Sequence, residues 1–244
     1  MLRPEGDCEP VAKVRLVQPL PADRPTPDLH PADRAAVVDL LGVLAYGELT
    51  AFDRLALDAR MAPTLSGRVA LADMAAAELD HFRRLVARLQ QLGVDPEAAM
   101  LPFVAALDAF HDFTRPADWL EGLVKAYVGD GIAADFYREI AGALDEATRA
   151  LVLDVLSDTG HAEFAVREVR AAIASDPSVG GRLALWARRL VGEAISQAQR
   201  VAADRDALIV LLVQGSGDLS GVGALIRRVT AAHAERLTAL GLSS

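Results

Sequence analysis

Residues 75–85, AAAELDHFRRL, place a carboxylate and an imidazole three positions apart, at Glu78 and His81. Side chains three positions apart on an α-helix project from the same face, so this pair could bind one ion. An acid-x-x-His pair is also common on exposed helices, where it is only a solvated surface pair. The rest of the sequence is therefore needed to distinguish a surface pair from half of a metal site.

A second pair occurs in residues 158–164, DTGHAEF, where Asp158 and His161 have the same spacing. Both members lie 80 positions after their counterparts (158 − 78 and 161 − 81). Two pairs at one offset are less expected by accident than a single pair. The offset favours an internal repeat.

A lone acid precedes each pair. The segment YGELTAFDRL contains Glu48, the segment VGDGIAADFY contains Asp130, and the two align on a Gly-acid step. The chain thus has the order acid, acid-x-x-His, acid, acid-x-x-His. Ferritin-like four-helix bundles distribute the ligands of a two-metal carboxylate site over their helices in this way. The pattern predicts metal ligands at Glu48, Glu78, His81, Asp130, Asp158 and His161.

The composition favours a helical fold. The chain has 244 residues, of which 52% are hydrophobic and only 5% aromatic. It is long enough to bury a sizeable core, and its Ala- and Leu-rich runs favour helices over strands. We expect an all-α protein whose four core helices cover about residues 31–61, 68–92, 116–144 and 145–174, with residues 96–112 as a crossover connection between the second and third.

The remaining segments are expected to flank that core. Residues 1–30 are rich in proline and predict a flexible, extended arm. Residues 31–244 then form one ferritin-like domain, with the four-helix core over about 33–174. Accessory helices follow over about 178–240, interrupted by the Gly-rich stretch GSGDLSGVG at 215–223.

The candidate ligands indicate the kind of metal. Four carboxylates buried together would repel one another and have strongly raised pKa values, whereas two divalent cations would neutralise them. Oxygen and imidazole ligands suit two iron ions, or manganese. The chain has a single cysteine, Cys8, outside the predicted core, which argues against a structural zinc site with thiolate ligands.

The ligand order and the helix lengths resemble the ferritin-like superfamily, and within it the MiaE-like proteins related to a tRNA hydroxylase. The resemblance covers about residues 33–174. It implies a non-haem di-iron hydroxylase that uses dioxygen and an electron donor, with a modified tRNA nucleoside as one candidate substrate. It also implies terminal ligands at Glu48 and Asp130, bridging carboxylates at Glu78 and Asp158, and one imidazole for each iron at His81 and His161.

The second half of the pattern departs from that family. Aspartate stands at Asp130 and Asp158, where a shorter side chain must still reach the metals, and Gly160 lies inside the ligand turn. Gly lowers helix preference by about 1 kcal/mol relative to Ala. The alternative function is therefore a non-catalytic metal-binding or scaffold protein with a degenerate second half-site.

Other polar and aromatic residues are weaker candidates for a role in the predicted site. Tyr46 and Tyr127 flank the proposed ligands and are candidates for hydrogen bonds to them, or for simple core packing. His30, His111 and His233 have no acid partner at a matching spacing and are expected to be surface or capping groups.

The charge and the termini set expectations about partners and location. A net charge of −9 argues against broad nucleic-acid affinity, although a local basic face remains a candidate at Arg182, Arg188, Arg189, Arg200 and Arg205. No signal peptide or continuous membrane-spanning apolar run is evident, so a cytoplasmic protein without membrane contact is expected. The sequence leaves a homo-oligomer open.

Overall fold

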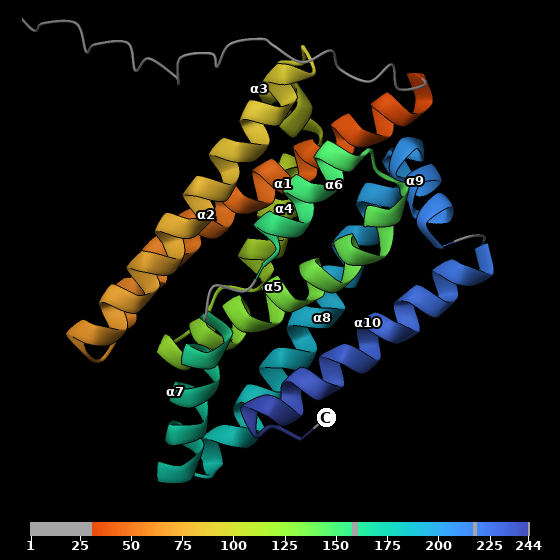
Figure 1. The fold of residues 1–244 in the computed structure, drawn as a ribbon. Helices are drawn as coiled ribbons and strands as arrows, with labels where there is room; N and C mark the ends of the chain where they lie inside the picture. The colour runs from red at the N-terminus through yellow and green to blue at the C-terminus, as the bar shows by residue number, and fades with distance from the viewer. Residues whose placement is uncertain (1–30, 158–160, 217–218, 244) are drawn as a thin grey trace, which may run out of the picture.

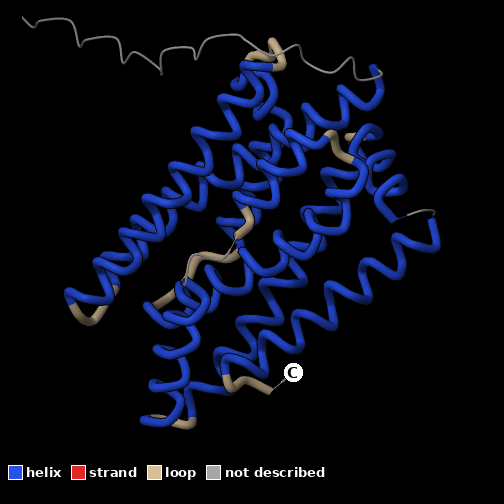
Figure 2. Tube along the Cα trace, viewed as in Figure 1, coloured by secondary structure: helices blue, strands red, loops and turns tan. Residues whose placement is uncertain are grey.

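The computed structural model describes residues 31–157, 161–216 and 219–243, and within these ranges every regular element is a helix (Figures 1 and 2). The all-α fold predicted from the sequence is confirmed. The α-helices are α1 (Pro31–Asp58), α2 (Leu65–Gln91), α3 (Pro96–Met100), α4 (Val104–Phe113), α5 (Trp119–Ile140), α6 (Glu146–Val155), α7 (His161–Ser175), α8 (Ser178–Asp204), α9 (Asp206–Ser216) and α10 (Leu219–Leu240). Short 3-10 turns follow at Ala59–Met61, Leu101–Phe103 and Ala141–Ala143.

Helices α1 and α2 form a long antiparallel hairpin and pack against each other along their length (Figure 1). Thr64 begins α2 because its hydroxyl accepts a hydrogen bond from the Gly67 amide at 3.1 Å. Gly93 ends it in a left-handed conformation with φ of 69°, as predicted, and the Val94 amide donates to the Leu89 carbonyl. Both ends of the helix that carries Glu78 and His81 are therefore defined by local residues.

The segment between the second and third predicted core helices is largely helical. Asp95 caps α3 with Pro96 at its first position, and α4 then lies across α1 and α8. Asp118 begins α5 by accepting from the Glu121 amide at 2.9 Å. This connection carries the chain from the α1–α2 hairpin to the second half of the fold.

The fourth predicted core helix, over residues 145–174, is wrong as one continuous helix. The chain forms α6 and α7 instead, and these run in different directions (Figure 1). At the end of α6 the Ser157 hydroxyl donates to the Asp154 carbonyl at 2.7 Å, which satisfies a helix-terminal carbonyl. Ser, Asp, Thr and Gly occupy residues 157–160, and all four types disfavour a helix interior.

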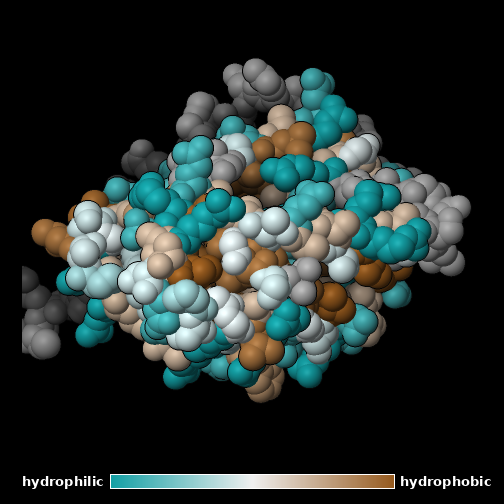
Figure 3. All heavy atoms as spheres, turned by 90° about the horizontal axis from the view of Figure 1, so that it is seen from below, coloured by the Kyte–Doolittle hydropathy of each residue, from teal (hydrophilic) through white to brown (hydrophobic). Residues whose placement is uncertain are grey.

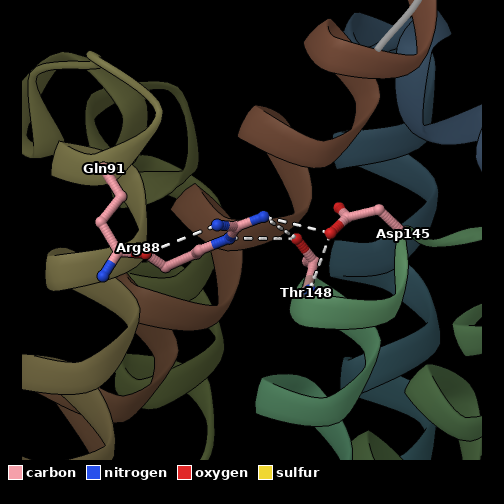
Figure 4. A network of polar contacts seen from close by, with 4 residues as sticks. All are labelled: Arg88, Gln91, Asp145 and Thr148. Carbon is pink, nitrogen blue, oxygen red and sulfur yellow. Dashed lines mark hydrogen bonds and ion pairs between the residues drawn. The ribbon is translucent and has the colours of Figure 1, made fainter. Parts of the chain in front are cut away.

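A buried polar network joins α6 to α2 (Figure 4). The Arg88 guanidinium reaches from α2 to the first turn of α6, where Nη2 donates to Asp145 Oδ1 and to Thr148 Oγ1, both at 3.1 Å. Asp145 also caps α6 by accepting from the Thr148 amide at 3.1 Å. One carboxylate therefore starts α6 and fixes it against the ligand-bearing helix.

Two hydrophobic clusters make up the core. One contains Leu55, Leu71, Leu123 and residues of α7, α8 and α10. The other contains Leu41 of α1 and residues of α2, α6 and α9. Each of the helices α1, α2 and α5 has one stretch of side chains in the first cluster and another stretch in the second, which gives two apolar levels along the helix axis. Polar residues on these three helices occupy the level between them.

The C-terminal helices cover α5. Helices α8 and α10 both pack on it, and α9 packs on α1. The last helix begins at Leu219, inside the stretch 215–223 that was expected to be a break, so that break is shorter than predicted. Seen from below, hydrophobic residues lie in small groups among hydrophilic ones (Figure 3).

One helix among the described residues, Asp33–Met61, has the length and apolar composition of a membrane span. It packs against α2, α3 and α9 and supplies Leu40, Leu41 and Leu44 to the core. Core helices of this length and composition pass the same test.

Candidate metal centre

Three of the predicted ligands come together on the α1–α2 hairpin. Glu48 of α1 lies between the two hydrophobic clusters, after Ala45 in one and before Leu55 in the other. Glu78 and His81 occupy the corresponding level of α2. Because hydrophobic side chains lie above and below this level, the three polar side chains share a largely enclosed place in the fold.

The geometry of this Glu48–Glu78–His81 group suits a shared ion. One ligand atom of each residue lies within 4.8 Å of the others, and His81 Nδ1 is 3.5 Å from Glu48 Oε2 and 3.6 Å from Glu78 Oε2. The side chains are 12%, 11% and 14% exposed for Glu48, Glu78 and His81. Neighbouring ligand atoms at ~2.1 Å from one ion lie about 3 Å apart, so modest side-chain movement would bring all three to it.

The group is electrostatically strained without a cation. Burial, and then contact with the Glu48 carboxylate, raise the pKa of Glu78 to about 8. The pKa of His81 is raised to about 10 because its contacts with Glu48 and Glu78 outweigh its burial. In the metal-free chain, a proton on Glu78 and a protonated imidazole therefore balance the negative charge.

One oxygen of this group is a ligand atom without a hydrogen bond. Glu48 Oε2 is buried and has no hydrogen-bond partner among the residues that the structure describes. A buried carboxylate oxygen in this position costs free energy unless a cation or a donor satisfies it. Two carboxylates and an imidazole, with no thiolate, form a donor set for iron or manganese. The residues present therefore fit such a metal.

Of the second half of the predicted site, the two residues that the structure describes, Asp130 and His161, do not join this group. Asp130 lies on α5 between Val128 and Ile132, which belong to or pack against the cluster that contains Leu55, and its side chain is exposed. His161 is the first residue of α7, and among the described residues neither it nor Asp130 belongs to the group of ligand atoms. Asp158 lies outside the described residues. His161 therefore begins α7 and does not lie inside one continuous helix over residues 145–174.

A tyrosine that the sequence did not single out lies near the group. Burial, and then the negative charge of Glu48, raise the pKa of Tyr137 well above its ordinary value. Tyr137 belongs to α5 and packs against the cluster that contains Leu41. Tyr137 was not predicted as a residue of the site, because an aromatic residue on the core face of a helix is ordinary packing in most bundles.

A hydrogen bond to the predicted ligands, one of the two roles that the sequence left open for Tyr46, is not the bond that its hydroxyl makes. Its hydroxyl donates to Asp108 Oδ1 of α4 at 2.7 Å, so it faces the crossover connection. Tyr127 is half-buried and packs against the cluster that contains Leu55. Tyr46 therefore anchors α4 to α1, two positions before Glu48.

Two histidines expected at the surface are not there. His111 Nε2 lies 3.1 Å from Thr50 Oγ1 of α1, and burial lowers the pKa of its imidazole to about 3. His233 of α10 is buried and has a lowered pKa, because of its burial and then the charge of Arg236. His30 lies outside the described residues. Sequence spacing to an acid missed His111 because its neighbour Thr50 belongs to another helix.

Two of the five arginines of the candidate basic face contact carboxylates. Arg182 forms ion pairs with Asp118 and Glu121, and Arg205 lies 3.9 Å from Asp39. Arg189 lies over the Trp186 ring, and the Arg188 guanidinium donates to the Ser243 carbonyl. Contacts within the chain thus occupy much of the charge that a nucleic-acid face would need.

Comparison with known proteins supports the fold assignment. A search of curated proteins gave no match. Residues 31–215 match the family described as the ferritin-like domain of actinomycetes. That range contains all six predicted ligands and most of the helical fold. The chain therefore belongs to the family of ferritin-like domains of actinomycetes.

Proposed function

We propose that this protein binds an iron or manganese ion at Glu48, Glu78 and His81. The observation that carries the proposal is the convergence of these three side chains, with His81 Nδ1 3.5 Å and 3.6 Å from the two carboxylates. The family is ferritin-like, and bundles of this kind build metal sites from inward-facing carboxylates and histidines.

The side chains have distinct roles in this proposal. Glu48 and Glu78 supply negative charge, and His81 supplies a nitrogen ligand once it has lost its proton. Because Glu78 and His81 both hold protons in the metal-free chain, metal binding must release protons. Tyr137 is buried on α5, close enough to Glu48 for the charge of this carboxylate to raise its pKa. A bound iron would supply one-electron redox chemistry with dioxygen.

The more specific proposal is a MiaE-like di-iron hydroxylase that uses dioxygen and an electron donor. It requires Asp130, Asp158 and His161 as the second half-site. The repeat of acid and acid-x-x-His in the sequence supports it. A modified tRNA nucleoside as substrate rests on the family resemblance alone.

The alternative is a non-catalytic metal-binding protein with one complete half-site. The exposed side chain of Asp130 and the break before α7 favour this form. The geometry of the described residues supports a single-metal site best. The di-iron hydroxylase and the single-metal protein differ in the number of ions bound per chain and in whether His161 contributes to metal binding.

The test is anaerobic reconstitution with ferrous iron or manganese, followed by metal analysis and thermal melting. His81→Ala and His161→Ala are matched variants, since each removes the imidazole of one acid-x-x-His pair. A single-metal protein holds about one ion per chain, loses metal-linked stabilisation in His81→Ala and keeps it in His161→Ala. An ion at 100 times its Kd stabilises the fold by about 2.7 kcal/mol, which melting readily detects.

Other outcomes separate the alternatives. About two ions per chain, with losses in both variants, would support the di-iron hydroxylase. Oxygen consumption that needs both metals and an added reductant would then identify an enzyme. A wild-type chain that takes up neither metal and shows no metal-dependent melting would rule out both forms.

A further inference from the structure

The turn between α1 and α2 is an exposed end of the molecule. At the left of Figure 1 this hairpin extends beyond the other helices. Leu65 begins α2 and is 77% exposed, and Leu57, near the end of α1, and Val69 are each 51% exposed. We call Leu57, Arg60, Leu65, Arg68 and Val69 the hairpin tip.

The first turns of α2 have one buried face and one exposed face. Gly67 and Leu71 are buried, and a Cβ atom at Gly67 would lie 3.1 Å from the Trp119 ring of α5. Leu65 and Val69 are each two positions from Gly67, which is about 200° around the helix. They therefore share the face of α2 that is turned away from α5, where removal from water would lower their free energy.

The charge of the hairpin tip is opposite in sign to that of the whole chain. Residues 59–72, ARMAPTLSGRVALA, contain two arginines and no carboxylate, whereas the chain has a net charge of −9. Arg60 and Arg68 are both exposed, and within the described ranges neither forms an ion pair. The nearest exposed acids in the sequence, Asp53 and Asp73, lie farther from the turn. The tip thus presents two unpaired guanidinium groups beside exposed aliphatic side chains.

We propose that the hairpin tip binds the surface of an anionic lipid bilayer. Guanidinium groups pair with lipid phosphates, while neighbouring aliphatic side chains enter the boundary between headgroups and acyl chains. The expectation of no membrane contact rested on the absence of a signal peptide and of a membrane-spanning apolar run. A peripheral contact of this kind requires neither.

A lipid surface fits the hairpin tip better than a second protein does. Specific protein interfaces use about 20–30 residues on each side, and the tip is much smaller. A bilayer, in contrast, adapts to a small protruding element, and each arginine near an anionic surface strengthens binding about fivefold. We therefore expect weak, reversible binding that decreases as salt screens the charges.

The experiment is cosedimentation of the full chain, freed of metal with a chelator, with vesicles of phosphatidylcholine alone or mixed with phosphatidylglycerol. Glu78 lies about 20 Å along α2 from Leu65 (78 − 65 = 13 positions), so this binding does not depend on the metal. We expect the chain to bind the mixed vesicles and not phosphatidylcholine alone. Leu65→Ser should weaken binding about tenfold or more, and Arg68→Gln about fivefold. Because both side chains are exposed, each variant should keep the helical circular dichroism of wild type.

Two control variants test whether the position of the substituted residue matters. Leu101→Ser is the apolar control, since Leu101 is 68% exposed but follows α3, at the opposite end of the hairpin (Figure 1). Arg227→Gln is the charge control, because Arg227 is an exposed arginine of α10. Each control should leave the vesicle dissociation constant within about twofold of wild type.

Three outcomes would overturn the proposal. One is wild-type protein that does not sediment with the mixed vesicles. Another is an equal loss of binding in the tip variants and the controls, which would show a diffuse effect of charge or hydrophobicity. The third is a dimer in analytical ultracentrifugation that Leu65→Ser abolishes, without vesicle binding, which would show that a second copy of the chain covers the tip.

Discussion

Arg88 of α2 and Asp145 of α6 form a nearly buried ion pair, with Nη2 3.1 Å from Oδ1 and the side chains only 10% and 9% exposed. Asp145 Oδ2 is also buried and has no partner among the described residues, so the arginine supplies most of the compensation for this carboxylate. The pair connects α2, which carries Glu78 and His81, to α6.

Arg88→Ala should destabilise the protein by about 3–5 kcal/mol, because it leaves the Asp145 carboxylate buried without its partner. Chemical denaturation measures the change. Arg84→Ala is the matched control, since Arg84 pairs with Asp154 across the same two helices but is 36% exposed, with Asp154 62% exposed. Arg84→Ala should lower the free energy of unfolding by no more than about 1 kcal/mol. Equal losses of stability in Arg88→Ala and Arg84→Ala would contradict the assignment of Arg88 as the residue that holds α6 against α2.

Gly42 marks a close approach between α1 and α3. A Cβ atom there would lie 2.2 Å from the Ala99 carbonyl oxygen, a backbone atom that cannot rotate away. Gly42→Ala should therefore destabilise the fold by about 1–3 kcal/mol or more. Gly192→Ala in α8 is the comparison, because apart from its chain neighbours and the backbone of its own helix no heavy atom of the described chain lies within 4 Å of its Cβ position. Thermal melting should show Gly192→Ala unchanged or stabilised by up to about 1 kcal/mol, and a stabilised Gly42→Ala variant would refute the close contact.

Much of the helical fold could be predicted because helix-forming periodicity and helix ends are local properties. Gly93 ends α2 where the sequence indicated, and the predicted first and second core helices differ from α1 and α2 by a few residues. The break between α6 and α7 was harder to see, since the apolar periodicity continues on both sides of residues 156–160. The local signal was in residues 157–160, since Ser, Asp, Thr and Gly all disfavour a helix interior.

The candidate site was predictable only in the half that lies on one hairpin. Glu48, Glu78 and His81 meet because α1 and α2 are neighbours in sequence and pack along their length. Whether Asp130 and His161 approach them depends on how α5 and α7 are oriented, which is determined by contacts with α8 and α10. Those contacts join residues far apart in the sequence and have no spacing signature. Tyr137 was missed for the same reason.

Lys125 should make stability depend on pH in the alkaline range. Its Nζ donates to the Thr114 carbonyl at 2.8 Å, and burial, opposed by the nearby Asp58, lowers its pKa from 10.5 to about 8. The unfolded chain binds more protons between these values, so the free energy of unfolding should rise with pH from 8 to 10, by about 2–3 kcal/mol from this group. Lys125→Met, which has no titrating amine, should lack this rise in urea denaturation at each pH. Parallel pH profiles for the two proteins would show that Lys125 is not the source.

Glu78→Gln should separate the stability of the metal-free chain from its metal affinity. The folded-state pKa of Glu78, about 8, lies above its ordinary value of 4.5, so wild-type protein loses stability as pH rises from about 4.5 to about 8. Glutamine is neutral in both states and avoids this loss. The metal-free variant should match wild type near pH 4.5 and exceed it increasingly toward pH 8, on the order of a few kcal/mol. The same substitution removes a charged ligand, so added iron or manganese should no longer raise the melting temperature. A variant that is less stable than wild type by the same amount at pH 5 and pH 8 would show that the Glu78 carboxylate is not buried against Glu48, and one that keeps metal-linked stabilisation would exclude Glu78 as a ligand.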